Sequence, residues 1–117
     1  MVVENLASDQ ADRLFHALAD ATRRDILLRT LEGQHNVSTL ARSYPMSFAA
    51  VQKHVAVLEG AGLVVKERTD REQLVSGNVI TIRKAYQLLA QLEAVWEGRL
   101  DRIGEMLADE HKEGPRT

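Results

Sequence analysis

Between Ser47 and Glu59 the sequence gathers side chains that could read DNA. At helical spacing, one face of this stretch carries small, amide-bearing or cationic residues, and no carboxylate occurs before Glu59. A glutamine amide can make two hydrogen bonds to an adenine edge, and a lysine can reach guanine or a phosphate. The side chains predicted to face the bases are Ser47, Phe48, Ala49, Gln52 and Lys53.

A helix over residues 47–60 must position these side chains. We predict Ser47 as its N-cap, because a serine hydroxyl can accept a hydrogen bond from an amide of the first turn. Val51, Val55 and Leu58 recur at spacings of four and three, which places them on one inward face. Glycines 60 and 62 are predicted to end the helix.

A β-hairpin is predicted to follow as a wing over residues 64–77, with a polar turn at residues 69–71. Arg68 and Arg71 lie at its tip, where cations can enter a minor groove or neutralise phosphates. Acidic residues alternate with these arginines, so a solvated charged turn remains the alternative.

Three helices are predicted before this unit, from apolar spacing and breaker residues. The second is predicted to be capped by Thr22 and stopped by Gly33, with Ile26, Leu27, Thr30 and Leu31 facing inward. Residues 34–36 are predicted as a loop. The helices cover residues 9–19, 22–32 and 37–44, and Pro45 ends the third.

The final segment, residues 79–111, returns to helical spacing with apolar residues three and four apart and Asn78 as its predicted cap. This stripe, together with two leucines of the first helix, predicts a homodimer interface. A small-molecule pocket lined by Trp96 is the alternative for that residue. The interface residues are Leu14, Leu18, Leu89, Leu92, Trp96, Leu100, Ile103 and Leu107.

Length and composition bound the class of protein. The 117 residues allow one domain, predicted over residues 9–111, with flexible ends at 1–8 and 113–117. Cysteine is absent, and we see neither a signal peptide nor an apolar run that could span a bilayer, so a cytoplasmic protein is expected. The net charge is −2, but residues 21–71 carry eight bases against five acids. The predicted recognition unit lies in that positive part.

Three segments carry a family resemblance: ALADATRRDIL at residues 17–27, VSTLAR at 37–42 and MSFAAVQKHVAVLEGAGLV at 46–64. They resemble the ArsR-type winged helix-turn-helix repressors. The resemblance implies a mainly α fold with a small β-hairpin and a long C-terminal dimerisation helix. It further implies a homodimeric repressor that binds an imperfect palindromic operator in double-stranded DNA.

Several positions can be compared with the family's pattern. His54 matches a common histidine, which either contacts DNA or is a satisfied, partly buried residue. Phe48 stands where many relatives are polar or basic, so it either packs on a thymine methyl or braces the helix. Asp70 replaces a usual glycine at the wing turn. Arg23 and Arg24 match paired arginines, which we assign to helix packing and ion pairs.

The resemblance also implies metal sites, but this sequence lacks their ligands. Asn36 and Ser38 stand where a thiolate site would need cysteines, and the final helix has only His111 for a second site. The four histidines are dispersed. We therefore expect no metal and no cofactor, which indicates a metal-ligand-free subgroup; whether a small-molecule effector exists stays open.

Two other classes of function remain to be weighed. A winged-helix module that binds protein rather than DNA would suit the acidic overall charge. An enzyme would need a nucleophile, a base and an oxyanion site brought together, and no spacing indicates them. We predict no catalytic residues.

Overall fold

The computed structural model describes residues 7–113, with side chains through residue 109. The predicted flexible ends therefore lie, apart from residues 7, 8 and 113, outside the described residues. Ser8 accepts a hydrogen bond from Ala11 N at 3.1 Å and caps the first described helix. The elements in chain order are α2 (Asp9–Leu18), α3 (Ala21–Glu32), β1 (His35–Asn36), α4 (Val37–Ala41), α5 (Phe48–Gly60), β2 (Val64–Thr69), β3 (Glu72–Gly77) and α6 (Val79–Glu113).

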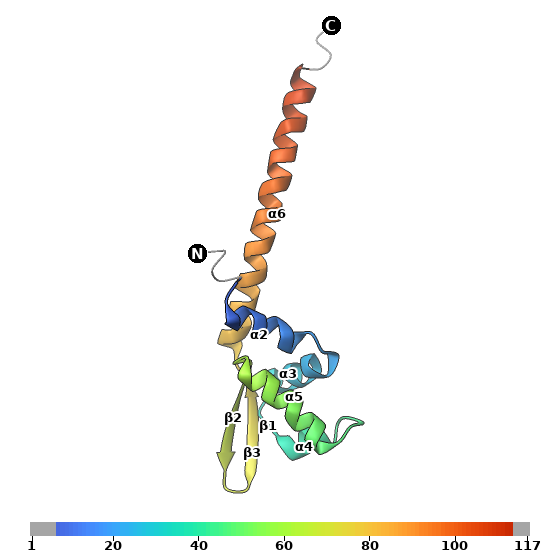
Figure 1. The fold of residues 1–117 in the computed structure, drawn as a ribbon, viewed down its shortest axis with the longest axis vertical. Helices are drawn as coiled ribbons and strands as arrows, with labels where there is room; N and C mark the ends of the chain where they lie inside the picture. Colours follow the sequence, from blue (N-terminus) through green and yellow to red (C-terminus); the bar gives the residue numbers. More distant parts are fainter. Residues whose placement is uncertain (1–6, 114–117) are drawn as a thin grey trace.

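The molecule has two regions of different construction (Figure 1). Residues 9–91, which we call the body, pack α2 to α5, the sheet and the first turns of α6 together. Residues 92–113, which we call the distal α6, continue the last helix away from the body. At 1.5 Å per residue, the 35 residues of α6 extend about 50 Å.

The core of the body is a single apolar cluster that draws on every helix and on the wing. Leu14, Ile26, Leu40 and Leu58 are each at most 1% exposed. Val75 of β3 is fully buried beside them, which fixes the hairpin to the helices. The inward faces predicted for Val51, Val55 and Leu58 are confirmed.

Two predicted positions need correction on burial. Leu31 is 40% exposed, although it was predicted to face inward, and it lies against Gly77 at the end of β3. Leu14, predicted for the dimer interface, is 1% exposed and belongs to the core of its own chain. It has almost no surface left for a second copy, so that part of the predicted interface is wrong.

The sheet has three antiparallel strands in the order β1-β3-β2. β2 and β3 form the predicted wing, with Lys66 opposite Val75 and Thr69 opposite Glu72. The predicted loop at residues 34–36 is right for Gln34 and wrong for His35 and Asn36, which pair with Val75 and Leu74. Two residues are too few to show a strand pattern, and their pairing depends on β3, which lies far along the chain.

The helix ends differ from prediction at three places. Asp20, not Thr22, caps α3, since its extended backbone lets the carboxylate accept from Arg23 N at 3.0 Å. α4 ends at Ala41 rather than residue 44. Gly60 lies within α5, and Gly62, with φ +79°, supplies the left-handed conformation after it.

The long helix α6 joins the body by its first turns. Asn78 accepts a hydrogen bond from Ile80 N at 3.1 Å, as its predicted capping role requires. Thr81, Ala85 and Leu88 are buried against the body. No helix within residues 7–113 combines the length and the apolar character needed to cross a membrane.

Candidate nucleic-acid interface

Capping and burial fix the orientation of α5. Ser47 has an extended backbone, with φ −67° and ψ 156°, and its hydroxyl accepts from Ala50 N at 3.1 Å. The predicted N-cap is therefore confirmed. Because Val51 and Val55 are buried on one side, Gln52 and Lys53 are left exposed on the other.

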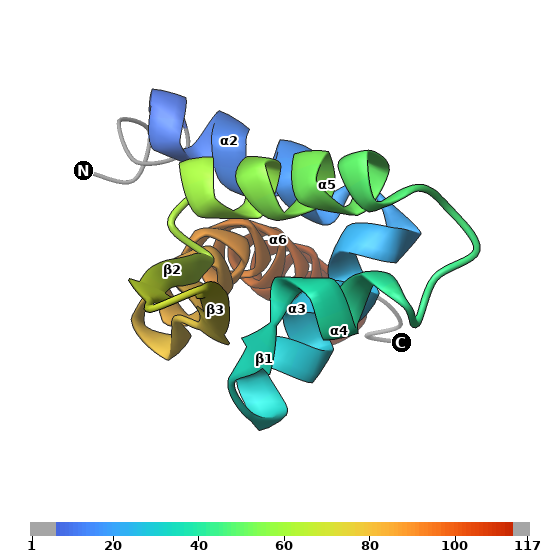
Figure 2. The ribbon, with the colours of Figure 1, turned by 90° about the horizontal axis from the view of Figure 1, so that it is seen from below.

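A shallow hollow of about 210 Å³ separates α5 from the wing. Phe48 and Gln52 line it from the helix, and Arg68 and Arg71 line it from the hairpin. The fold therefore brings together four of the predicted DNA-contacting residues, which come from segments about 20 residues apart in the sequence. Seen from below, α4, α5 and the hairpin lie together at the end of the molecule opposite the distal α6 (Figure 2).

The turn of the wing depends on the backbone conformation of Asp70. Asp70 has φ +49°, in the left-handed region where glycine is favoured and aspartate is tolerated. Thr69 pairs with Glu72, so Asp70 and Arg71 alone form the turn. Both arginines of the wing are exposed. Glu72 lies beside them in the lining of the hollow and lowers its positive charge.

The other predicted contact residues lie outside the hollow. Ser47, Ala49 and Lys53 are exposed on the same helix. His54 is half-buried, with Nδ1 3.4 Å from Arg23 Nη1 and 3.9 Å from Asp20 Oδ2. It contacts the α2–α3 corner, as the interpretation of a satisfied, partly buried histidine predicted.

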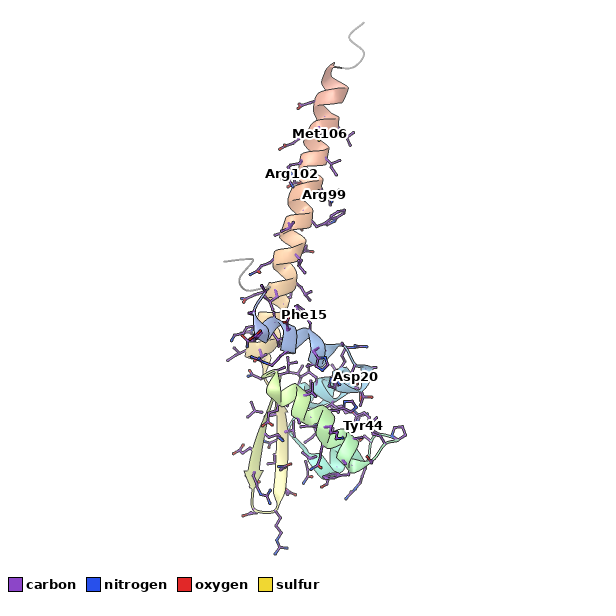
Figure 3. The ribbon with its side chains drawn as sticks, in the orientation of Figure 1. Phe15, Asp20, Tyr44, Arg99, Arg102 and Met106 are labelled. Carbon is purple, nitrogen blue, oxygen red and sulfur yellow. The ribbon has the colours of Figure 1, made fainter. Side chains whose placement is uncertain are left out.

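The paired arginines hold that corner together. Arg23 donates to the main-chain carbonyls of His16 and Ala17, each at 2.9 Å, and Arg24 donates to Leu18 O at 2.7 Å. These bonds satisfy carbonyls at the end of α2, which would otherwise lack partners. The backbone hydrogen bond from Arg23, followed by the nearby charge of His54, lowers the pKa of Asp20. The predicted structural role of the arginines is confirmed, and it acts chiefly through these carbonyls. Asp20 marks this corner in Figure 3.

A second polar cluster positions the chain just before α5. The Tyr44 hydroxyl donates to Asp25 Oδ2 at 2.6 Å, and Arg29 Nε donates to the same oxygen at 2.9 Å. The Arg29 guanidinium also lies 5.3 Å from the centre of the Tyr44 ring. The hydrogen bond from Tyr44 is the largest cause that lowers the pKa of Asp25, and the hydrogen bond from Arg29 is the next. Burial, followed by the hydrogen bond to Asp25, raises the pKa of Tyr44. The cluster ties the α4–α5 turn to α3.

Three further polar residues line the hollow and were not selected as DNA contacts from the sequence. They are Asn36 and Ser38 at the start of α4 and Gln73 on β3. Asn36 and Ser38 were considered only as positions that lack metal ligands. The sequence feature that could have pointed to Asn36 and Ser38 is a helix N-cap: the Asn36 side chain accepts a hydrogen bond from Ser38 N at 2.8 Å. In the part of the chain that the structure describes, no cluster of three or more His, Asp or Glu side chains could hold a metal.

Comparison with known proteins connects this geometry to a family. No protein-family model matches the chain. An ArsR-like transcriptional regulator from Rhodococcus sp. RHA1 superposes with a TM-score of 0.74 at 30% identity, over 83% of this chain and 92% of that one. The chain belongs to the ArsR family of transcriptional regulators.

Two further relatives of this ArsR-family protein are informative. The HTH-type transcriptional regulator Rv2034 of Mycobacterium tuberculosis is 49% identical over 53 residues, which cover 45% of this chain. The match spans about half the length of that regulator. The homodimeric winged helix-turn-helix DNA-binding domain of Mb0332 from Mycobacterium bovis shares the fold, with a TM-score of 0.56 at 24% identity, over 93% of this chain and 87% of that one. The winged helix-turn-helix fold predicted from the sequence is confirmed.

Proposed function

We propose that this ArsR-family protein is a homodimeric transcriptional repressor that binds an imperfect palindromic operator. α5 enters the major groove, and the wing contacts the adjacent backbone or minor groove. The observation that carries the proposal is the hollow in which Phe48 and Gln52 of the helix face Arg68 and Arg71 of the wing. A groove with base-reading groups on one wall and cations on the other suits the edge of a DNA duplex.

The proposed roles follow from side-chain chemistry and exposure. Gln52 is exposed and can pair with an adenine edge, and Lys53 can reach a guanine or a phosphate. Phe48 is 45% exposed, so its ring can pack on a thymine methyl. Arg68 and Arg71 neutralise phosphates. Ser47 and His54 chiefly orient the helix, through its N-cap and through the α2–α3 corner.

Dimerisation is proposed from the exposed apolar row of α6. Leu89, Leu92, Trp96, Leu100, Ile103 and Leu107 are between 42% and 59% exposed. A row of this length on one helix is unfavourable in water and is typical of an interface between copies. The homodimeric Mb0332 domain supports such an assembly in a related fold. Two copies would then present two recognition helices to half-sites about one DNA turn apart, or a multiple of it.

The test is fluorescence anisotropy with DNA from the protein's own promoter region and with random DNA, across salt concentrations. We expect Lys53→Ala, Arg71→Ala to weaken operator binding at least tenfold and to lower the salt slope by about one for each phosphate that is no longer neutralised. The matched control removes two exposed cations away from the hollow, Arg13→Ala and Arg102→Ala, and should change affinity little.

The opposite result would point to another role for the same surface. If the protein bound its promoter no better than random DNA, and the hollow variant bound like the control, operator binding would be contradicted at that promoter. A genome-wide search for sites would then follow. If that search also found none, the exposed Phe48 and the acidic residue of the hollow would favour a winged-helix module that binds protein.

A further inference from the structure

A second cavity, of about 300 Å³, lies on the far side of the body from the wing, between α2 and α6. Its floor is apolar, because Ala11, Leu14 and Leu88 are all buried in the core. Its walls are polar: Gln10 comes from α2, and Lys84, Gln87 and Gln91 come from α6. A cavity of this size with an apolar floor and a few converging polar groups is typical of a small-molecule site.

One polar atom in this wall has no partner among the described residues. Gln91 Oε1 is buried from solvent and accepts no hydrogen bond from the part of the chain that the structure describes. Burying an amide oxygen without a donor is unfavourable, and native proteins keep few such atoms. Because Gln91 lines the cavity, a molecule bound there could supply the missing donor. A ligand that carries a hydroxyl or an amine has such a donor.

The charge of the wall adds a second requirement. Among the residues that line this cavity in the described chain, Lys84 is the single charged side chain. An ammonium group pairs best with an anion, and a carboxylate matches it without needing a second cation. The apolar floor accommodates a short hydrocarbon chain.

We propose that the α2–α6 cavity binds a small hydroxy- or amino-carboxylate with a short apolar chain, which acts as an effector. The carboxylate pairs with Lys84, the hydroxyl or amine donates to Gln91 Oε1, and the chain lies over Leu88, which at 8% is the most exposed of the three floor residues. The effector role rests on the proposed DNA-binding function, whereas the site itself does not.

The position of the cavity explains how occupancy would reach the DNA-binding surface. α2 forms one wall and is tied at its other end to Arg23 and Arg24, next to His54 of α5. α6 forms the opposite wall and continues directly into the exposed apolar row. A ligand between the two helices would change the angle between α2 and α6. In a dimer, that angle sets the separation of the two recognition helices.

The first experiment needs no DNA and uses three matched probes: 3-hydroxyoctanoate, octanoate and 1,3-octanediol. Calorimetric titration should show saturable binding of 3-hydroxyoctanoate. Octanoate lacks the donor for Gln91, and the diol lacks the carboxylate for Lys84, so each should bind about tenfold more weakly. Absence of saturable binding of 3-hydroxyoctanoate would overturn the proposal.

Variants locate the site and separate a ligand role from a structural one. Gln91→Leu and Lys84→Gln should each weaken 3-hydroxyoctanoate binding about tenfold, whereas Gln34→Leu, in an exposed loop, should not. Without ligand, Gln91→Leu should raise the melting temperature, because it removes a buried acceptor that has no donor. A lower melting temperature together with unchanged ligand binding would show that Gln91 serves the fold and would overturn the site.

The effector role is then tested by repeating the DNA titration with saturating 3-hydroxyoctanoate. A change in operator affinity that Gln91→Leu abolishes would support it. Unchanged affinity in a protein that binds both operator and ligand would overturn the regulatory role alone. A protein that binds the ligand at this site but no operator would contradict the proposed function and leave the binding site intact.

Discussion

Leu58 and Leu100 both lie on the apolar face of a helix, but they have different surroundings. Leu58, in α5 of the body, is fully buried by the other helices of its own chain. Leu100, in the distal α6, is 46% exposed, and its apolar neighbours along the helix are exposed with it. The body satisfies its apolar stripes internally, whereas the distal α6 has a stripe that its own chain does not cover. The two regions should therefore respond differently to the same kind of substitution.

The largest effect is expected from placing charge on the apolar row. Leu100→Lys with Ile103→Lys should abolish self-association and weaken operator binding more than tenfold, because an interface must then bury two ammonium groups. Analytical ultracentrifugation measures the first effect and anisotropy the second. Trp96 is the sole tryptophan of the chain, so its fluorescence reports burial of the row directly. Glu105→Lys, on the opposite face of the helix, is the control. A double variant that stayed dimeric would show that the apolar row of the distal α6 is not the interface between copies.

A truncation at each leucine separates stability of the body from association. Leu58→Ala should lower the free energy of unfolding by about 2–5 kcal/mol, through reduced burial and the cavity left behind. Leu100→Ala should lower it far less at dilute protein, where copies are apart. Urea denaturation followed by circular dichroism at two protein concentrations measures both. If both variants lost the same free energy of unfolding at the low protein concentration, Leu100 would be covered by its own chain.

Glycine-to-alanine substitutions make the same comparison with a smaller change. A Cβ added at Gly77 would lie 2.6 Å from Leu31 Cδ2 and 3.1 Å from Leu31 Cα, so β3 or α3 must shift. Gly77→Ala should therefore destabilise the body by about 1–3 kcal/mol. At Gly98 the added Cβ meets nothing within 4 Å. Gly98→Ala should stabilise α6 by about 0.5–1 kcal/mol. Thermal unfolding should show opposite signs, and a stabilising Gly77→Ala would contradict the close packing.

The smallest effect concerns the tyrosine that ties the α4–α5 turn to α3. Tyr44→Phe should cost about 1 kcal/mol of unfolding free energy near neutral pH, because it removes the bond to Asp25. Folding raises the pKa of Tyr44, so this contribution is fully present below the ordinary value of 10.0 and is lost as pH rises through the raised pKa. The gap between wild type and variant should close in alkali. Tyr86→Phe is the control, since Tyr86 is 70% exposed; an equal gap for it would contradict the role of Tyr44.

Local chemistry made much of the body predictable. The cap at Ser47 and the inward face of α5 each depend on a few adjacent residues, and the structure confirms both. Asp20 was missed as a cap because Thr22 is also a capping type, and the choice depends on where the chain leaves α2. The candidate DNA-contact residues could be selected by residue type and helical spacing, but the sequence did not reveal the hollow between α5 and the wing.

The sequence alone determined the order of the helices, the hairpin of the wing, the inward face of α5 and the resemblance to the family, because periodicity and turn residues are encoded within about ten residues. Only the tertiary structure decided which apolar residues the chain covers by itself. It placed Leu14 in the core and left Leu100 exposed, although both belong to helical stripes. It also joined β1 to β3 and formed the cavity beneath Gln91. These features require segments that are distant in the sequence to meet in space. A local sequence pattern does not specify which distant segment will pack against it.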